Sequence, residues 1–276
     1  MPEMPEVETI RRIIEPQVAD RTIQSVEVLH PQVIAHPDSS TFACRLVDQT
    51  IVGMGRRGKF LMFKLGSGDK LVLHLRMTGQ LLVTPADYPK EKHTHVIMVL
   101  SDGREIRYID QRRFGRFWLI EANESDAAVG MDRLGVEALD DALAGGYLRE
   151  RLGKRKKTSK EALLDQSIVA GIGNIYADEI LWVARIHPEK PCNKLSAQAW
   201  NKLAAAIKDV IAWGIETNEM TPEEYLAGKG KEYNNIPDLK AYGRDGEPCL
   251  RCGRPLKRLT ISGRSSYCCP YCQRKS

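Results

Sequence analysis

Four cysteines near the carboxyl end constrain the fold of this chain more than any other feature. They form two Cys-x-x-Cys pairs separated by sixteen residues: Cys249, Cys252, Cys269 and Cys272. Each pair can place two thiolates on one side of a tetrahedral ion, and this spacing is typical of a four-cysteine zinc site. Residues 256–267 read as a β-hairpin that turns at Ser262-Gly263, and so short a segment takes its folding free energy from the metal. We predict one structural Zn²⁺, with Cys268 outside its ligand set.

Basic residues gather in two blocks that the net charge of +5 conceals. Residues 244–276 hold eight basic and two acidic side chains, and residues 151–160 hold six basic side chains and no acid. Two separated basic blocks favour a polyanionic partner such as nucleic acid, although solvated surface charge remains an alternative for either block alone. No apolar run approaches the roughly 18 residues of a membrane span, and there is no basic-then-apolar leader, so we expect a cytoplasmic protein that binds no membrane.

The hydrophobic pattern changes along the chain and predicts an α+β protein of several domains. An amphipathic helix at 5–18 precedes strands at 22–29, 59–65, 70–75, 95–100 and 105–109. Short strands at this spacing indicate a β-sandwich or barrel. Helical periodicity follows at 140–152, 160–169, 175–184 and 197–217, and Ser196 is a natural cap for the last helix. We therefore expect domains at 1–130, 131–240 and 241–276, with a long loop at 217–239 that holds one helical turn at 222–226.

The first nine residues, Met-Pro-Glu-Met-Pro-Glu-Val-Glu-Thr, carry the first candidate chemistry. Met1 precedes the small residue Pro2, so we expect its removal, which leaves Pro2 with a terminal secondary amine. An α-amino group titrates near pH 7.7–8.0, and a secondary amine can condense with an aldehyde-like carbon to a cationic iminium. Glu3 beside it can act as an acid or a base. The alternative is that Pro5 and the glutamates simply begin a helix.

Residues 160–179 form the most specific string in the chain. Gly171 and Gly173 allow a tight double turn, and Asn174 can cap a helix that begins at Ile175, where free N–H groups offer a phosphate site. An ordinary capped helical hairpin explains the same string. In the zinc segment, Arg264 follows the hairpin turn and can contact phosphate oxygens.

Several motifs occur in one order along most of the chain. They are the amino-terminal nine residues, Arg56-Arg57-Gly58-Lys59, Leu75-Arg76-Met77-Thr78-Gly79, residues 110–115 (Asp-Gln-Arg-Arg-Phe-Gly), residues 164–179 and the four-cysteine finger. Together they resemble the formamidopyrimidine-DNA glycosylase family of bacterial base-excision repair. The resemblance implies an amino-terminal β-sandwich with a helix, a helix–two-turns–helix domain and a zinc hairpin. It also implies a monomer that acts at the nucleoid on double-stranded DNA with damaged bases or abasic sites.

The resemblance implies a role for each matching residue. Pro2 would attack the anomeric carbon of a flipped-out nucleotide and displace its base, and Glu3 would protonate the ring oxygen. Successive β and δ eliminations would then cut the strand. Lys59 and Arg264 match residues that act at the sugar or its phosphates. Met77, Arg112 and Phe114 match side chains that fill the space left by the base. Five further residues are expected to bind the strand: His74, His93, Lys160, Asn174 and Lys257.

The segment before Tyr242-Gly243-Arg244 departs from the family pattern. The family's recognition loop begins with two glycines and two hydroxyl residues, whereas this chain has Gly214-Ile215-Glu216-Thr217. The expected substrates are oxidised purines, namely 8-oxoguanine and formamidopyrimidines. An endonuclease VIII-like enzyme for oxidised pyrimidines remains an alternative, and so does a DNA-binding protein without catalysis.

Overall fold

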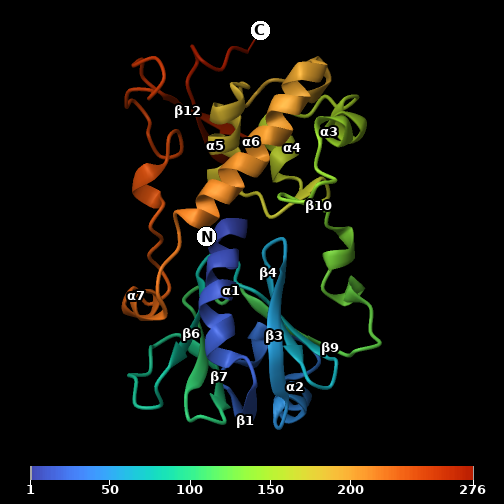
Figure 1. Ribbon diagram of the computed structural model, residues 1–276, viewed down its shortest axis with the longest axis vertical. Helices are drawn as coiled ribbons and strands as arrows, with labels where there is room; N and C mark the ends of the chain where they lie inside the picture. Colours follow the sequence, from blue (N-terminus) through green and yellow to red (C-terminus); the bar gives the residue numbers. More distant parts are fainter. Residues whose placement is uncertain (1, 276) are drawn as a thin grey trace. The chain divides into compact units, whose positions relative to one another are not determined.

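The computed structural model describes residues 2–275, and its backbone separates into two units. The first unit contains Pro2 and residues 6–132 and 219–233. The second contains residues 3–5, 133–218 and 234–275. Each unit has its own hydrophobic core, and the segments of both are coloured along the chain in Figure 1.

The first unit is built on one continuous sheet folded into two layers. Its nine strands are β1 (Arg21–Val28), β2 (Ile34–His36), β3 (Thr50–Arg57), β4 (Phe60–Leu65), β5 (Lys70–His74), β6 (Gly79–Thr84), β7 (Thr94–Leu100), β8 (Glu105–Asp110) and β9 (Arg116–Ile120). Their order is β2-β9-β5-β4-β3-β1-β7-β8-β6. Strand β1 pairs with β3 through Arg21 and Thr22 and with β7 through residues 23–28, so it passes from one layer to the other.

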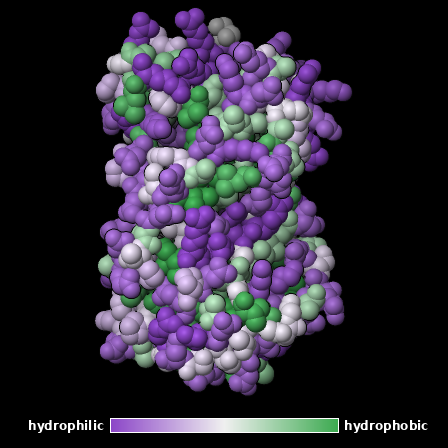
Figure 2. Space-filling view, in the orientation of Figure 1, coloured by the Kyte–Doolittle hydropathy of each residue, from purple (hydrophilic) through white to green (hydrophobic). Residues whose placement is uncertain are grey.

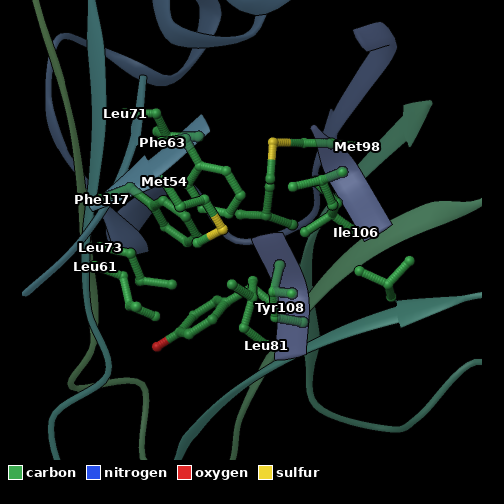
Figure 3. Close-up of a cluster of buried hydrophobic side chains, with 14 of the residues drawn as sticks. Met54, Leu61, Phe63, Leu71, Leu73, Leu81, Met98, Ile106, Tyr108 and Phe117 are labelled. Atoms are coloured by element: carbon green, nitrogen blue, oxygen red, sulfur yellow. The ribbon is translucent and has the colours of Figure 1, made fainter. Parts of the chain in front are cut away.

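The core of this unit lies between the two layers. Figure 3 shows Met54, Phe63 and Phe117 from β3, β4 and β9 facing Leu81, Ile106 and Tyr108 from β6 and β8. The Tyr108 and Phe117 rings meet edge to face with centroids 5.0 Å apart. Burial on the inner faces explains the alternation in the predicted strands and confirms the β-sandwich. Strands β2, β3, β6 and β9 are missing from the predicted set. Two glycines interrupt β3, and every residue of β6 is buried, so neither strand shows the alternating pattern.

Helix α1 (Met4–Val18) confirms the predicted amphipathic helix and packs its apolar face into this core, where Val7, Ile10, Ile14 and Val18 are fully buried. The helix continues past Pro16 to Val18. Helix α2 (Ser39–Leu46) was not predicted; its start is set by the Asp38 carboxylate, which accepts hydrogen bonds from two backbone N–H groups. The predicted helical turn in the loop is α7 (Pro222–Ala227), which begins with a Thr221–Glu224 capping box.

The second unit is mainly helical. It contains α3 (Gly145–Leu152), α4 (Ser159–Leu164), α5 (Asn174–Ala184) and α6 (Ala197–Glu216), with a short parallel pair β10 (Val136–Glu137) and β11 (Val169–Ala170). The Ser196 hydroxyl accepts from the Ala199 N–H, so the predicted cap of α6 is confirmed. Helix α4 ends earlier than predicted because the chain turns at Asp165 toward β11.

The carboxyl-terminal hairpin consists of β12 (Lys257–Ile261) and β13 (Arg264–Cys268). Ser262 and Gly263 both have positive φ angles, 48° and 75°, which suits a two-residue hairpin turn. The predicted hairpin and its turn are therefore confirmed.

Short 3-10 turns lie at Pro31–Val33, Asp126–Ala128, Met131–Arg133, Cys192–Lys194 and Ile236–Asp238. Figure 2 shows hydrophilic residues over most of the visible face, with smaller hydrophobic areas between them. Within residues 2–275, the structure has no helix of the length and apolar character needed to cross a membrane.

Candidate active site and zinc centre

A pocket of about 320 Å³ in the first unit has the candidate nucleophile Pro2 on its wall. Met77 from the β5–β6 loop and His93 from the start of β7 line the same pocket, as does Tyr233. Burial raises the pKa of Tyr233, and Tyr225 and Glu6 act in the same direction, so its phenol stays protonated at neutral pH. The expected removal of Met1 lies outside the described residues.

The three side chains expected to fill the place of a missing base lie together. Met77 and Phe114 are unusually exposed for apolar residues, at 43% and 47%. Nη1 of Arg112 lies 3.0 Å from the Met77 sulfur, and the Arg112 guanidinium carbon lies 4.6 Å from the centre of the Phe114 ring. Two separate loops thus present one apolar surface with a cation at its centre.

Glu3 belongs to the second unit and caps helix α5. Its carboxylate accepts hydrogen bonds from the N–H groups of Gly173 (2.9 Å), Ile175 (2.9 Å) and Tyr176 (3.2 Å), and its residue is 1% exposed. The sequence predicts Asn174 as the cap of this helix. That prediction is wrong, because Gly173 is the cap residue without any side-chain bond and Asn174 is already helical. A charged carboxylate from the amino terminus takes the capping position instead.

Asn174 and the tip of the zinc hairpin are joined directly. The Asn174 amide nitrogen donates to the Ser265 carbonyl at 2.9 Å, next to the exposed Arg264. Lys257 is also exposed but pairs with Cys268 at the other end of the hairpin. Asn174 and Arg264 therefore form one group, from which Lys257 is separated by the length of a strand.

Lys160 does not fit the DNA contact expected of it. Its side chain is fully buried, and its Nζ donates at 2.8 Å both to the Asp178 carboxylate and to the Asn174 carbonyl. Asp178 also accepts from the Ser266 hydroxyl and the Tyr267 N–H. Burial lowers the pKa of Lys160 and raises that of Asp178 to about 6, while each group opposes the other's shift. The Lys160 side chain thus joins α4 to α5, and Asp178 holds the hairpin strand against α5.

Lys59 and His74 lie near one another in the first unit. Lys59 follows Gly58, whose φ of 54° closes the two-residue turn between β3 and β4. Burial, together with the charges of Arg76 and Lys59, lowers the pKa of His74 to about 3. Its neutral ring accepts a hydrogen bond from the Arg76 N–H at 3.0 Å. His74 therefore has no charge with which to attract a phosphate at neutral pH.

The four predicted zinc ligands converge, with all their sulfur atoms within 4.8 Å of one another. The Cys252 and Cys269 sulfurs are 3.6 Å apart, close to the roughly 3.8 Å expected between thiolates around a tetrahedral zinc. The Trp182 indole donates to the Cys249 sulfur at 3.4 Å. Cys268 lies outside the cluster, with its sulfur 4.0 Å from His187. The residues fit the ion, and the prediction of one structural zinc is confirmed.

Comparison with protein families covers most of the chain. Residues 1–117 match the formamidopyrimidine-DNA glycosylase N-terminal domain, residues 134–225 match the H2TH domain of the same glycosylase, and residues 246–274 match a zinc finger found in FPG and IleRS. Curated formamidopyrimidine-DNA glycosylases of Pelotomaculum thermopropionicum and Desulforamulus reducens are 42% and 43% identical, over 99% of this chain and 99% of each relative.

Solved structures agree with these matches. The Lactococcus lactis enzyme bound to DNA containing N7-benzyl-Fapy-dG has a TM-score of 0.91 and 35% identity, over 99% of this chain and 100% of that chain. The same enzyme bound to abasic-site DNA has a TM-score of 0.89 and 33% identity, with the same coverage. The fold and site define a base-excision DNA glycosylase with a structural zinc finger. Within that class, the chain belongs to the formamidopyrimidine-DNA glycosylase family, and the predicted resemblance is confirmed.

Some residues that organise the site were not singled out from the sequence. Asp110 is buried and lies in the same motif as Arg112 and Phe114, but the motif alone does not indicate its role. The Glu179 carboxylate accepts from three successive backbone N–H groups, those of Lys240, Ala241 and Tyr242. In both cases the signal in the sequence is an acidic residue within an otherwise apolar helix or strand. A carboxylate buried in such an element needs hydrogen-bond donors around it.

Proposed function

We propose that this protein removes a damaged base from DNA and then cuts the strand, with Pro2 as the nucleophile. The observation that carries the proposal is the pocket that holds Pro2, Met77 and His93 together. The Pro2 nitrogen forms a bond to the anomeric carbon while the bond from that carbon to the base breaks. Protonation of the ring oxygen then breaks its bond to the anomeric carbon, which opens the sugar and leaves a cationic iminium on Pro2. This iminium withdraws electrons from the sugar, which permits β and then δ elimination of the two phosphates.

Glu3 is the proposed partner of Pro2 in this reaction. Its carboxylate is held by three N–H groups at the start of α5, and it follows Pro2 directly in the chain. In this role it stabilises the cationic iminium and transfers a proton at the ring oxygen. Lys59 and Arg264 supply positive charge to the sugar and its flanking phosphates. Their positions in the matching motifs support these roles. Arg264 is also exposed, and it precedes Ser265, which accepts the Asn174 hydrogen bond.

We assign the remaining DNA contacts according to their surroundings. Met77, Arg112 and Phe114 fill the space left by the extruded nucleotide, which suits two exposed apolar side chains flanking a hydrogen-bond donor. His93 faces the pocket, while Asn174 and Lys257 approach the phosphates from the second unit. His74 acts as a neutral group that shapes its loop. Lys160 acts through Asn174 rather than on DNA.

The proposed substrates are oxidised purines in double-stranded DNA, together with abasic sites. A second class is supported by a Lactococcus lactis relative, 36% identical with a TM-score of 0.91, whose structure holds DNA containing an oxidised pyrimidine. Duplexes with 8-oxoguanine, formamidopyrimidine and thymine glycol at one position test the choice. We expect faster excision of the two purine lesions, and preferential excision of thymine glycol would contradict the assignment.

We further propose that the enzyme acts as a monomer. We place it at the cytoplasmic nucleoid, because its proposed substrate is chromosomal DNA. Domains at 1–130, 131–240 and 241–276 remain our proposed division of the chain, with 217–239 as a loop that contacts the lesion. Sedimentation of the protein with and without a lesion duplex tests the monomer, and a 2:1 complex would contradict it.

A further inference from the structure

The two loops that carry Met77, Arg112 and Phe114 meet at one buried carboxylate. Asp110 is the last residue of β8 and is fully buried. One of its oxygens accepts from the Thr78 hydroxyl and from the Arg112 N–H at 3.1 Å. The other accepts from the Gly115 N–H at 2.9 Å and from the Tyr108 hydroxyl at 2.9 Å. One side chain thus bonds directly to both loops.

These bonds compensate for the cost of burying Asp110. Burial acts to raise the pKa of Asp110, but donation from Thr78, Gly115, Tyr108 and Arg112 outweighs it and holds the pKa below its usual value. Asp110 is therefore ionised at neutral pH, and its carboxylate accepts hydrogen bonds from four donors. Asparagine at this position would replace one of the two oxygens with an NH2 group, which donates. The Thr78 hydroxyl and the Gly115 N–H donate to different oxygens, so asparagine could not accept from both.

Both loops need such a restraint because their backbones are strained. Arg76, just before Met77, has a φ of 56°, and Arg113, between Arg112 and Phe114, has a φ of 57°. A left-handed conformation is unfavourable for a residue with a side chain and persists where its surroundings enforce it. Gly115 also approaches Tyr108 closely, since a Cβ there would lie 1.9 Å from the phenolic oxygen. The loops are therefore fixed in a conformation that the chain does not prefer.

We propose that Asp110 is a positioning residue that holds Met77, Arg112 and Phe114 as one preformed wedge before DNA binds. The inference rests on the proposed function, because the wedge has a task only if a nucleotide leaves the duplex stack. Asp110 itself touches neither DNA nor the reacting sugar. Its contribution is to remove the freedom of the two loops, which would otherwise have to be restrained during base extrusion.

The experiment uses Asp110→Asn in the full-length protein with two abasic substrates, one a duplex and the other a single strand. Borohydride reduces the iminium and traps the covalent complex, and the rate of trapping is measured on each substrate. In the duplex the wedge must replace lost stacking, whereas the single strand has no stack to maintain. We expect a loss of about 10- to 100-fold on the duplex and a change within about threefold on the single strand.

Asp102→Asn is the matched control. Asp102 lies on the turn between β7 and β8, at the opposite end of β8 from Asp110, and its carboxylate accepts hydrogen bonds from Arg21 and Arg104. It should trap both substrates at wild-type rates. Should Asp110→Asn fail to fold by circular dichroism, Thr78→Val tests the same tie, because it removes one donor to Asp110 and keeps a β-branched side chain.

Three outcomes decide the matter. A duplex-specific loss in Asp110→Asn, or in Thr78→Val where that variant is the one tested, supports the preformed wedge. Equal loss on both substrates, or no loss on either, overturns it and leaves Asp110 with a general structural role. Failure of the wild-type protein to trap the single strand and the duplex alike refutes the proposed function itself.

Discussion

Gly173→Ala should damage the active site although the backbone of Gly173 suits any residue. Its φ of −124° is ordinary extended geometry, so conformational freedom does not require glycine here. Close approach does, because a Cβ would lie 2.3 Å from the Glu3 carboxyl carbon and 2.4 Å from Oε1. These atoms need more than 3 Å, so the Glu3 carboxylate must move by about 1 Å.

That displacement removes Glu3 from the amino end of α5. Three N–H donors then lose a charged acceptor, and hydrogen bonds to charged groups contribute about 1.5–3 kcal/mol each, part of which water restores. We expect the free energy of unfolding to fall by about 2–4 kcal/mol. A shift of about 1 Å in a reacting group can lower the rate about 100-fold, so trapping of abasic DNA should fall by a similar factor.

Gly146→Ala is the matched control, since Gly146 lies in α3 and a Cβ there meets nothing within 4 Å. Its stability should stay within about 1 kcal/mol of wild type or rise slightly. Urea unfolding followed by tryptophan fluorescence gives the stabilities, and borohydride trapping gives the rates. A Gly173→Ala protein with wild-type stability and wild-type trapping would refute the capping role of Glu3.

Three other perturbations follow from the same structure. Between pH 7 and pH 5 the protein should lose about 2 kcal/mol of stability from His74, because its folded pKa of about 3 lies below the unfolded value near 6.5 and this stability is lost as pH falls. Melts at both pH values should show a weaker pH dependence in His74→Asn, and an unaltered one would contradict this. Lys160→Met leaves Asp178 buried without its cation and should cost about 3–5 kcal/mol of unfolding free energy, which adding Asp178→Asn should partly restore; a stable single variant would disprove the pairing. Cys252→Ser should lower bound zinc below one ion per chain by native mass and loosen the hairpin, whereas full zinc content would exclude Cys252 as a ligand.

Features that depend on near neighbours in the chain could be predicted from the sequence. The stripe of Val7, Ile10 and Ile14 predicts the buried face of α1, and Ser262-Gly263 predicts the hairpin turn. The cysteine spacing predicts the metal because two short turns are enough to place four sulfurs around one ion. The family and its fold could be recognised because motifs from all parts of the chain match in one order.

Features that depend on distant partners could not be predicted. Glu3 caps a helix that begins 171 residues later in the chain. The local sequence therefore favours Asn174 as the cap, although Asn174 does not cap the helix. Lys160 stands among exposed basic residues in the sequence but is buried, because Asp178 on another helix supplies its counter-charge. Asp110 precedes the arginines of its motif, and its function depends on Thr78 from a different loop. In each case a buried charged side chain is stabilised by partners that are distant in the sequence, and local periodicity does not reveal those partners.

The most direct test of the proposed chemistry is to locate the covalent bond to DNA. The full-length protein is incubated with duplex DNA containing an abasic site, reduced with borohydride, digested and analysed by peptide mass spectrometry. The account predicts a single adduct on the amino-terminal nitrogen of Pro2 in a chain that lacks Met1. An adduct on Lys59 or another lysine, or no adduct from correctly trimmed protein, would contradict it.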